Sequence, residues 1–202
     1  MSSLLLKYFP ALTAEQLAQY GRLEELYGTW NERVNLISRK DMENFFERHV
    51  LHSLGIARVV QFAPGTRVVD VGTGGGFPLV PLAIMFPACR FHGIDGTGKK
   101  IAAVQAIIAG AGLANCTAEQ VRSEDHHARY DVVVSRAVTA MPTFIGMTRH
   151  LVPRGSGKLY YLKGGELADE LLPLRQPYRV HELAEHFDEA FFATKKVVEV
   201  TY

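Results

Sequence analysis

Three glycines at alternate positions directly after an apolar run could let a ligand approach bare backbone. Gly72, Gly74 and Gly76 follow residues 68–71, Val-Val-Asp-Val, and residues 77–82 open a predicted helix. A residue without Cβ leaves room for close approach, and a helix N-terminus favours an anionic or polar ligand group. The spacing is G-x-G-x-G, which differs from the G-x-G-x-x-G of dinucleotide sites. The stretch therefore predicts a turn that binds a nucleoside-bearing ligand, with a tight turn that binds nothing as the alternative.

Asp95 is the second feature of this site, because it ends the next predicted strand, 21 residues after Gly74. A carboxylate there can accept both hydroxyl hydrogens of a ribose, although it could instead cap the following helix. Residues 151–155, Leu-Val-Pro-Arg-Gly, resemble the L-x-P-x-G turn before the fifth strand of many S-adenosylmethionine (AdoMet) methyltransferases. Residues 119–121, Glu-Gln-Val, end the third predicted strand, where the adenine usually lies in that fold. Together these features predict AdoMet as the ligand.

Residues 135–137, Ser-Arg-Ala, follow the fourth predicted strand and narrow the reaction. The acidic or amide residue followed by two prolines that amino-group methyltransferases often carry is absent there. A pyrimidine C5 methyltransferase needs a nucleophilic cysteine, whereas Cys89 and Cys116 begin the second and third strands, at the wrong edge. Arg136 stays protonated and cannot act as a base. The site therefore fits an acceptor atom that already has a free lone pair, such as guanine N7. Arg136 would then hold a phosphate or the O6 edge of the guanine. The alternative is that Arg136 forms an internal ion pair.

Five cations are expected on the rim that carries the ligand turn. Lys99, Lys100, Arg122, Arg136 and Lys163 each follow or end a predicted parallel strand, which predicts an anionic substrate over the methyl donor. Further cations that could widen this surface are Arg33, Arg39, Lys40, Arg48, Lys195 and Lys196. For each of them a solvated surface charge is the alternative. The adjacent His126 and His127 have no third ligand nearby in the sequence, so we predict no metal.

Composition and length indicate one soluble α/β domain with a small appendage. The chain has 202 residues, 48% of them hydrophobic, and a net charge of +1, which neither supports nor excludes RNA binding. The two cysteines form no metal-binding or redox motif and are expected to be reduced core thiols. The first ten residues lack the features of a signal peptide, and prolines interrupt the longest apolar run, residues 77–89. We expect a cytoplasmic monomer with no membrane contact.

The elements that must position these residues fall into two parts. Residues 1–60 read as helical: Thr13 and Gln16 form a capping box, Asp41 is expected to cap a second helix up to residue 50, and a third runs over residues 53–62. Strands are then predicted over residues 67–71, 90–95, 115–120, 130–136, 157–163, 178–187 and 195–202, and helices over 78–86, 99–111 and 143–151. This alternation predicts a Rossmann-like α/β fold with a doubly wound, mostly parallel sheet.

Several motifs in this order resemble the bacterial small-subunit rRNA guanine-N7 methyltransferase family RsmG, also called GidB. They are Trp30-Asn31 with Asn35-Leu36, Arg48-His49-Val50-Leu51 with Ser53, the stretch 70–78, Asp95 with Gly98-Lys99-Lys100, Ser135-Arg136-Ala137, and Leu162-Lys163-Gly164. The resemblance implies AdoMet-dependent N7 methylation of one guanine in the 530 loop of 16S rRNA. It also implies a seven-stranded sheet behind an N-terminal helical cap, which divides the chain into a cap of residues 1–62 and a methyltransferase domain of residues 63–202 in one compact unit.

The resulting site assignment combines the residue-based reading with the resemblance. The cofactor-binding residues are predicted to be Asp70, Gly72, Thr73, Gly74, Gly76, Phe77, Asp95, Glu119, Gln120, Val121 and Arg136. The catalytic residues are predicted to be Arg136, Lys163 and Arg122, and the RNA contacts Lys99, Lys100, Arg122, Arg136, Lys163 and Lys195.

The chain departs from the family pattern at three places. It has His52 where many members have Asp, Gly96 where Ser is common, and Lys195-Lys196 where an Arg is frequent. Two other functions stay open: methylation of a different substrate, and an RNA-binding assembly factor without turnover. Whether naked rRNA or an assembled ribosomal particle is the substrate also stays open.

Overall fold

A single seven-stranded sheet runs through the molecule, in the order β3-β2-β1-β4-β5-β7-β6. The computed structural model describes residues 2–202, without the side chains of Ser2 and Arg39. The strands are β1 (Arg67–Val71), β2 (Arg90–Asp95), β3 (Cys116–Gln120), β4 (Val132–Arg136), β5 (Lys158–Gly164), β6 (Tyr178–Glu182) and β7 (Lys195–Thr201). Strands β1 to β5 are parallel, and β7 pairs antiparallel with both β5 and β6. The predicted seven-stranded, mostly parallel sheet is confirmed.

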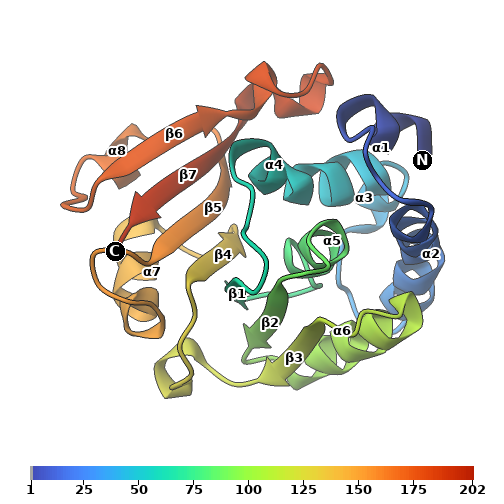
Figure 1. Cartoon of the computed structure of the whole chain (residues 1–202), viewed down its shortest axis with the longest axis horizontal. Helices are drawn as coiled ribbons and strands as arrows, with labels where there is room; N and C mark the ends of the chain where they lie inside the picture. Colours follow the sequence, from blue (N-terminus) through green and yellow to red (C-terminus); the bar gives the residue numbers. More distant parts are fainter. Residues whose placement is uncertain (1) are drawn as a thin grey trace.

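Helices and short turns connect the strands. The longer elements are α1 (Ser2–Tyr8), α2 (Ala14–Asn31), α4 (His52–Val59), α5 (Leu79–Met85), α6 (Gly98–Ala111) and α7 (Met141–Thr148). The shorter ones are α3 (Arg39–Met42), η1 (Phe46–Leu51), η2 (Ser123–Asp125), η3 (Arg149–Leu151), α8 (Ala168–Leu171), η4 (Leu183–Glu185) and η5 (Ala190–Thr194). In Figure 1, α2 and α6 lie at the β3 side of the sheet, while β6 and β7 form the opposite side. None of the described helices is long and apolar enough to cross a membrane.

Alternate residues of the central strands pack into two separate hydrophobic clusters. Val68 of β1 and Val134 of β4 belong to the cluster that holds α2, α4, α5 and α6, whereas Val69 and Val133 belong to the cluster under α7. Because successive strand side chains point to opposite faces, a strand covered on both faces is apolar throughout. This explains the Val-Val-Val run at residues 132–134.

The N-terminal helices share their interior with the sheet. Tyr20 and Tyr27 of α2 lie in the same cluster as the β1 residue Val68, and the Tyr20 hydroxyl donates to the Pro81 carbonyl at 2.9 Å. The expectation that this segment packs on the rest of the chain is therefore confirmed, while a domain boundary near residue 62 stays a prediction. A segment near the C-terminus also contacts these helices, because Lys7 of α1 pairs with Glu189, the residue before η5, at 3.0 Å.

The predicted N-cap was confirmed for α2 and wrong for the next helix. The Thr13–Gln16 capping box is present at α2. Ser38, not Asp41, caps α3, because its side chain accepts from the Asp41 backbone N–H. Asp41 instead binds Arg48 at 2.9 Å, and the predicted single helix up to residue 50 is interrupted, with η1 forming a π-helix. This widened segment, of a kind common at functional sites, carries buried His49 and leads into His52.

Candidate functional site

The glycine turn adopts left-handed backbone conformations and packs closely against a neighbouring loop. Gly72 has φ +70° and Gly74 has φ +54°, in the left-handed region that side chains disfavour. A Cβ at Gly72 would lie 2.6 Å from Cγ2 of Val138, on the loop after β4. At Gly74 the nearest atom to an added Cβ is 3.8 Å away, so the turn is open above this residue. The expected close approach to bare backbone is therefore available at Gly74.

Asp70 supports this turn from beneath. Its side chain is fully buried, and Oδ2 accepts hydrogen bonds from the Thr73 hydroxyl at 2.7 Å and from the Leu79 N–H at 3.1 Å. Burial raises the pKa of Asp70 to about 7, and these two donors oppose that shift only in part. The carboxyl therefore joins the turn to the start of α5, and its role in ligand binding stays a prediction.

Asp95 lies at the opening of the turn. Its Oδ2 accepts from the Gly74 N–H at 2.9 Å, and its Oδ1 accepts from the Thr97 N–H at 2.8 Å. Each oxygen keeps a second lone pair, so the half-buried carboxylate can still accept hydroxyl hydrogens. Asp95 therefore holds the start of α6, as in the capping alternative, and it also lines a cleft. Its contact with a ribose stays a prediction.

That cleft, called here the glycine-turn cleft, has a volume of about 350 Å³. It is lined by Val71, Gly72, Ile94, Asp95, Gly96, Thr97, Val121, Arg122, Ser123, Glu124, Val138 and Met147. Residues 119–121 were predicted to lie beside the adenine, and of these Val121 lines the cleft. Glu119 points instead toward His92 and His126, and the Gln120 amide donates to the Gly96 carbonyl at 3.3 Å.

A second hollow, the β4–β5 cleft, adjoins the first and has a volume of about 460 Å³. It is lined by His52, Arg136, Ala137, Val138, Thr139, Ala140, Leu162, Lys163, Gly164, Glu170, Phe191 and Lys195. Val138 lines both clefts, so the two hollows meet at this residue. The arrangement can place a bound donor on one side of Val138 and an acceptor on the other.

The loop of residues 137–140, which separates the clefts, is firmly held. Ala137 has φ +51°, a strained conformation for a residue with a Cβ. The Tyr161 hydroxyl accepts from the Val138 and Thr139 N–H groups at 2.9 Å each, and it donates to the Thr139 carbonyl at 2.9 Å. Lys163 also donates to that carbonyl, at 2.8 Å. The position of Val138 between the clefts is therefore fixed by β5.

Arg136 is a half-buried cation without a carboxylate partner among the described residues. Its guanidinium lies 5.0 Å from the centre of the Phe77 ring, and Nη2 lies 3.2 Å from Nδ1 of His49. Burial lowers the pKa of Arg136 to about 10 and that of His49 to about 4, so at neutral pH the arginine is charged and the histidine is neutral. The internal ion pair considered for Arg136 is not found in the described chain. Phe77, predicted to touch the cofactor, lies beneath Arg136.

The other predicted cations differ in whether an acidic side chain already pairs with them. Lys163 is tied to Glu170 at 2.8 Å, whereas Lys195 lies over the Phe191 ring at 4.8 Å with no ion pair in residues 2–202. Arg122 is exposed at the glycine-turn cleft. Lys99 and Lys100 start α6 and line neither cleft. The structure thus brings Arg136, Lys163 and Lys195 together in one cleft and leaves the others around the rim. Arg39 lies outside the described side chains.

Several site residues were missed at the sequence level. His49 contacts Arg136, Tyr161 holds the dividing loop, and His52 lines the β4–β5 cleft with its Nε2 buried and without a partner in the described chain. Burial also lowers the pKa of His52 well below its usual value, which keeps the ring neutral. The sequence did contain one signal for these residues, because His49 and His52 lie on the buried face of a helical segment that is otherwise apolar there.

Comparisons with known proteins show which family and which folds the chain resembles. Residues 14–198 match the model of the family GidB, rRNA small subunit methyltransferase G. The chain is 48% identical over 200 residues to a Ribosomal RNA small subunit methyltransferase G from Christiangramia forsetii, covering 96% of this chain and 94% of the relative. It is 49% identical to the protein of that name from Bacteroides fragilis, covering 98% of each. A SAM-dependent methyltransferase from Aquifex aeolicus shares the fold at a TM-score of 0.58 and 14% identity, over 81% of this chain and 98% of that one.

Proposed function

The chain belongs to the GidB family of small-subunit rRNA methyltransferases, and from this premise we propose that it methylates N7 of a guanine in the 530 loop of 16S rRNA. AdoMet is the donor in this proposal, in keeping with the SAM-dependent methyltransferase that shares the fold. The observation that carries the proposal is the meeting of the two clefts at Val138, which puts a nucleoside-sized hollow next to a cationic one.

The glycine-turn cleft has the features that AdoMet requires. Gly74 leaves its backbone open, Asp95 offers carboxylate oxygens for ribose hydroxyls, and Val121 offers an apolar contact for the adenine. AdoMet supplies an activated methyl group on a sulfonium centre. The residues of this cleft bind and orient it, with no proton transfer required of them.

The β4–β5 cleft fits an acceptor that has no proton to lose. Glu170, a carboxylate that lines it, is engaged by Lys163 and by the Met141 N–H at 3.0 Å. Arg136 is charged at neutral pH and held by its neighbours, so we assign it to a phosphate or to the O6 edge of guanine. We assign Lys163 to positioning the dividing loop, because it contacts Glu170 and the Thr139 carbonyl. Its predicted direct contact with an RNA phosphate or base oxygen stays a prediction.

The other cations in and around the clefts are assigned to the RNA backbone. Lys195 at the β4–β5 cleft and Arg122 at the glycine-turn cleft form no ion pair in the described chain, so both can contact phosphates. Lys99 and Lys100 widen the same rim. The target guanine would be turned out of its stack to reach the donor, as enzymes acting on bases require. The monomeric state and the cytoplasmic location stay predictions.

A methyl-transfer assay on defined RNA substrates tests this function. Naked 16S rRNA and 30S subunits from cells lacking this gene are incubated with the protein and labelled AdoMet, and 7-methylguanine is mapped by strand scission. We expect one modified guanine in the 530 loop. Transfer to peptides or metabolites but not to rRNA would assign another substrate. Binding to particles with no transfer would instead indicate an assembly factor.

A further inference from the structure

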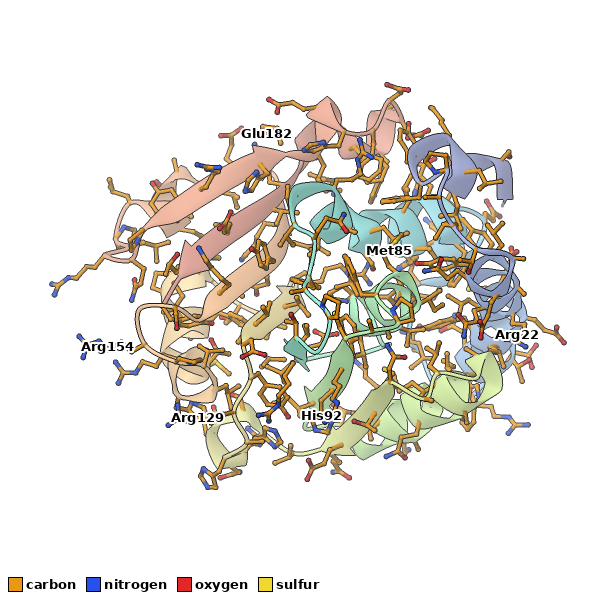
Figure 2. The ribbon with its side chains drawn as sticks, in the orientation of Figure 1. Arg22, Met85, His92, Arg129, Arg154 and Glu182 are labelled. Carbon is orange, nitrogen blue, oxygen red and sulfur yellow. The ribbon has the colours of Figure 1, made fainter. Side chains whose placement is uncertain are left out.

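Two histidines and a glutamate meet on one face of the sheet, apart from both clefts. They are His92 on β2, Glu119 on β3, and His126 just after η2, and one ligand atom of each lies within 4.8 Å of the others. The sequence showed no third candidate ligand near His126, and the fold brings His92 and Glu119 beside it. In the register of the sheet His92 pairs with Thr117, so Glu119, two residues further on, lies on the same face. Figure 2 labels His92, and also Arg129 on the loop that carries His126.

The outward ring nitrogens of both histidines have hydroxyl partners. Nδ1 of His92 lies 2.8 Å from the Thr117 hydroxyl, and Nε2 of His126 lies 2.8 Å from the Tyr130 hydroxyl. With the proton of each ring on these nitrogens, the inner nitrogens, Nε2 of His92 and Nδ1 of His126, carry free lone pairs. Metal-bound histidines show this same arrangement, with the second ring nitrogen bonded to an oxygen that fixes the ring.

The spacing of the inner atoms fits the ligands of one cation better than it fits short hydrogen bonds. Oε2 of Glu119 lies 3.4 Å from Nε2 of His92 and 3.7 Å from Nδ1 of His126. Nε2 of His92 is buried and makes no hydrogen bond within the described residues. Ligand atoms bound tetrahedrally to zinc at about 2.0–2.2 Å lie roughly 3.4 Å apart.

We propose that His92, Glu119 and His126 bind one divalent transition-metal ion, with zinc as the ion that best fits two imidazoles and a carboxylate. Three neighbouring acceptor atoms repel one another, and a cation between them removes that repulsion. The Glu119 side chain is 54% exposed, which leaves a fourth position open to water. The ion fastens residues 121–130 to β2 and β3. Residues 121–124 of that segment line the glycine-turn cleft, so the site positions one wall of the cleft.

The test is metal binding to the untagged full-length chain after chelator treatment. Titration with Zn²⁺ by calorimetry should show one ion per chain, and Co²⁺ should give the visible absorption of four-coordinate cobalt. His126→Ala should abolish both signals. The neighbouring His127 is exposed and outside the cluster, so His127→Ala should bind as the unmodified chain does.

Thr117→Val is a second variant that keeps all three ligands and changes an exposed residue. Loss of the hydroxyl that orients His92 should weaken zinc binding by about 10–100-fold, which a folding defect in His126→Ala would not obscure. Absence of stoichiometric binding to the unmodified chain, or equal binding by all these variants, would overturn the proposal. The three side chains would then be a polar cluster that binds no ion.

Discussion

Arg136 and His49 contact each other through a charged guanidinium and a neutral ring, with Nη2 of the arginine 3.2 Å from Nδ1 of the histidine. The two residues come from the end of β4 and from the π-helix η1, 87 positions apart. Because His49 cannot accept a proton at neutral pH, it acts as a hydrogen-bond acceptor that aims the arginine without neutralising it. The interrupted helix before α4 therefore serves the site directly.

Arg136→Lys should abolish most methyl transfer while leaving AdoMet binding intact. Lysine keeps the positive charge but not the planar fork that spans His49 and the Arg48 carbonyl, so the cation loses its fixed direction. We expect transfer to fall by about 10²-fold, the cost of misplacing one group at a reacting centre. Single-turnover rates on 30S subunits and calorimetric titration with AdoMet measure the two effects.

Arg154→Lys is the matched control, because this exposed arginine lies in the turn before β5, away from both clefts (Figure 2). It should transfer methyl groups as the unmodified protein does. An Arg136→Lys protein with undiminished turnover would remove Arg136 from the substrate site.

Asp95→Asn should weaken AdoMet binding without preventing folding. The amide keeps one acceptor oxygen for the Gly74 or Thr97 N–H but loses the charge that strengthens hydrogen bonds from ribose hydroxyls. A hydrogen bond to a charged group contributes about 1.5–3 kcal/mol, so the dissociation constant should rise by roughly tenfold or more. Equilibrium titration with AdoMet measures it. Asp131→Asn, whose carboxylate accepts from the Arg67 N–H at the opposite end of β1, is the control. Equal affinities for both variants would argue against the role of Asp95.

Lys195 and Lys196 are adjacent cations that should differ in their effect on RNA binding. Lys195 lines the β4–β5 cleft without an ion pair in the described part of the chain, whereas Lys196 binds Glu182 at 2.6 Å. Lys195→Gln should weaken binding to 16S rRNA and reduce the slope of log affinity against log salt by about 1, as expected for one lost phosphate contact. Lys196→Gln should leave that slope nearly unchanged. Filter binding over a range of potassium chloride concentrations measures both slopes, and an identical slope for Lys195→Gln and the unmodified protein would exclude the contact.

The sequence was sufficient to predict local structure where the residue types at a position permit only one conformation. The bounds of β1 and β2 were predicted to the residue, and the glycine spacing placed the turn. It was insufficient to predict side-chain contacts that depend on how distant segments of the chain pair. Glu119 ends β3 as expected, but the register with β2 turns it toward His92 and away from the glycine-turn cleft. Likewise, Lys163 has the expected position, and its engagement by Glu170 depends on a short helix that the sequence did not predict.

Asp70 should make stability depend on pH in the direction opposite to most carboxyl groups. Burial raises its pKa to about 7 in the folded protein, from 3.8. Between these values the folded state holds a proton that the unfolded state has released, so the free energy of unfolding falls as pH rises. Asparagine does not titrate. The stability difference between the unmodified protein and Asp70→Asn should therefore fall by up to roughly 4 kcal/mol from pH 4 to pH 7.

Urea unfolding at a series of pH values measures this difference, and taking the difference cancels the titration of the buried histidines, which both proteins share. Asp188→Asn is the control, because Lys7 lowers the pKa of that exposed carboxyl and its contribution is lost as pH falls. The difference for Asp188→Asn should thus not fall as pH rises from 4 to 7. Parallel curves for the unmodified protein and Asp70→Asn across this range would mean that the carboxyl is ionised in the fold, with the Thr73 and Leu79 donors outweighing its burial.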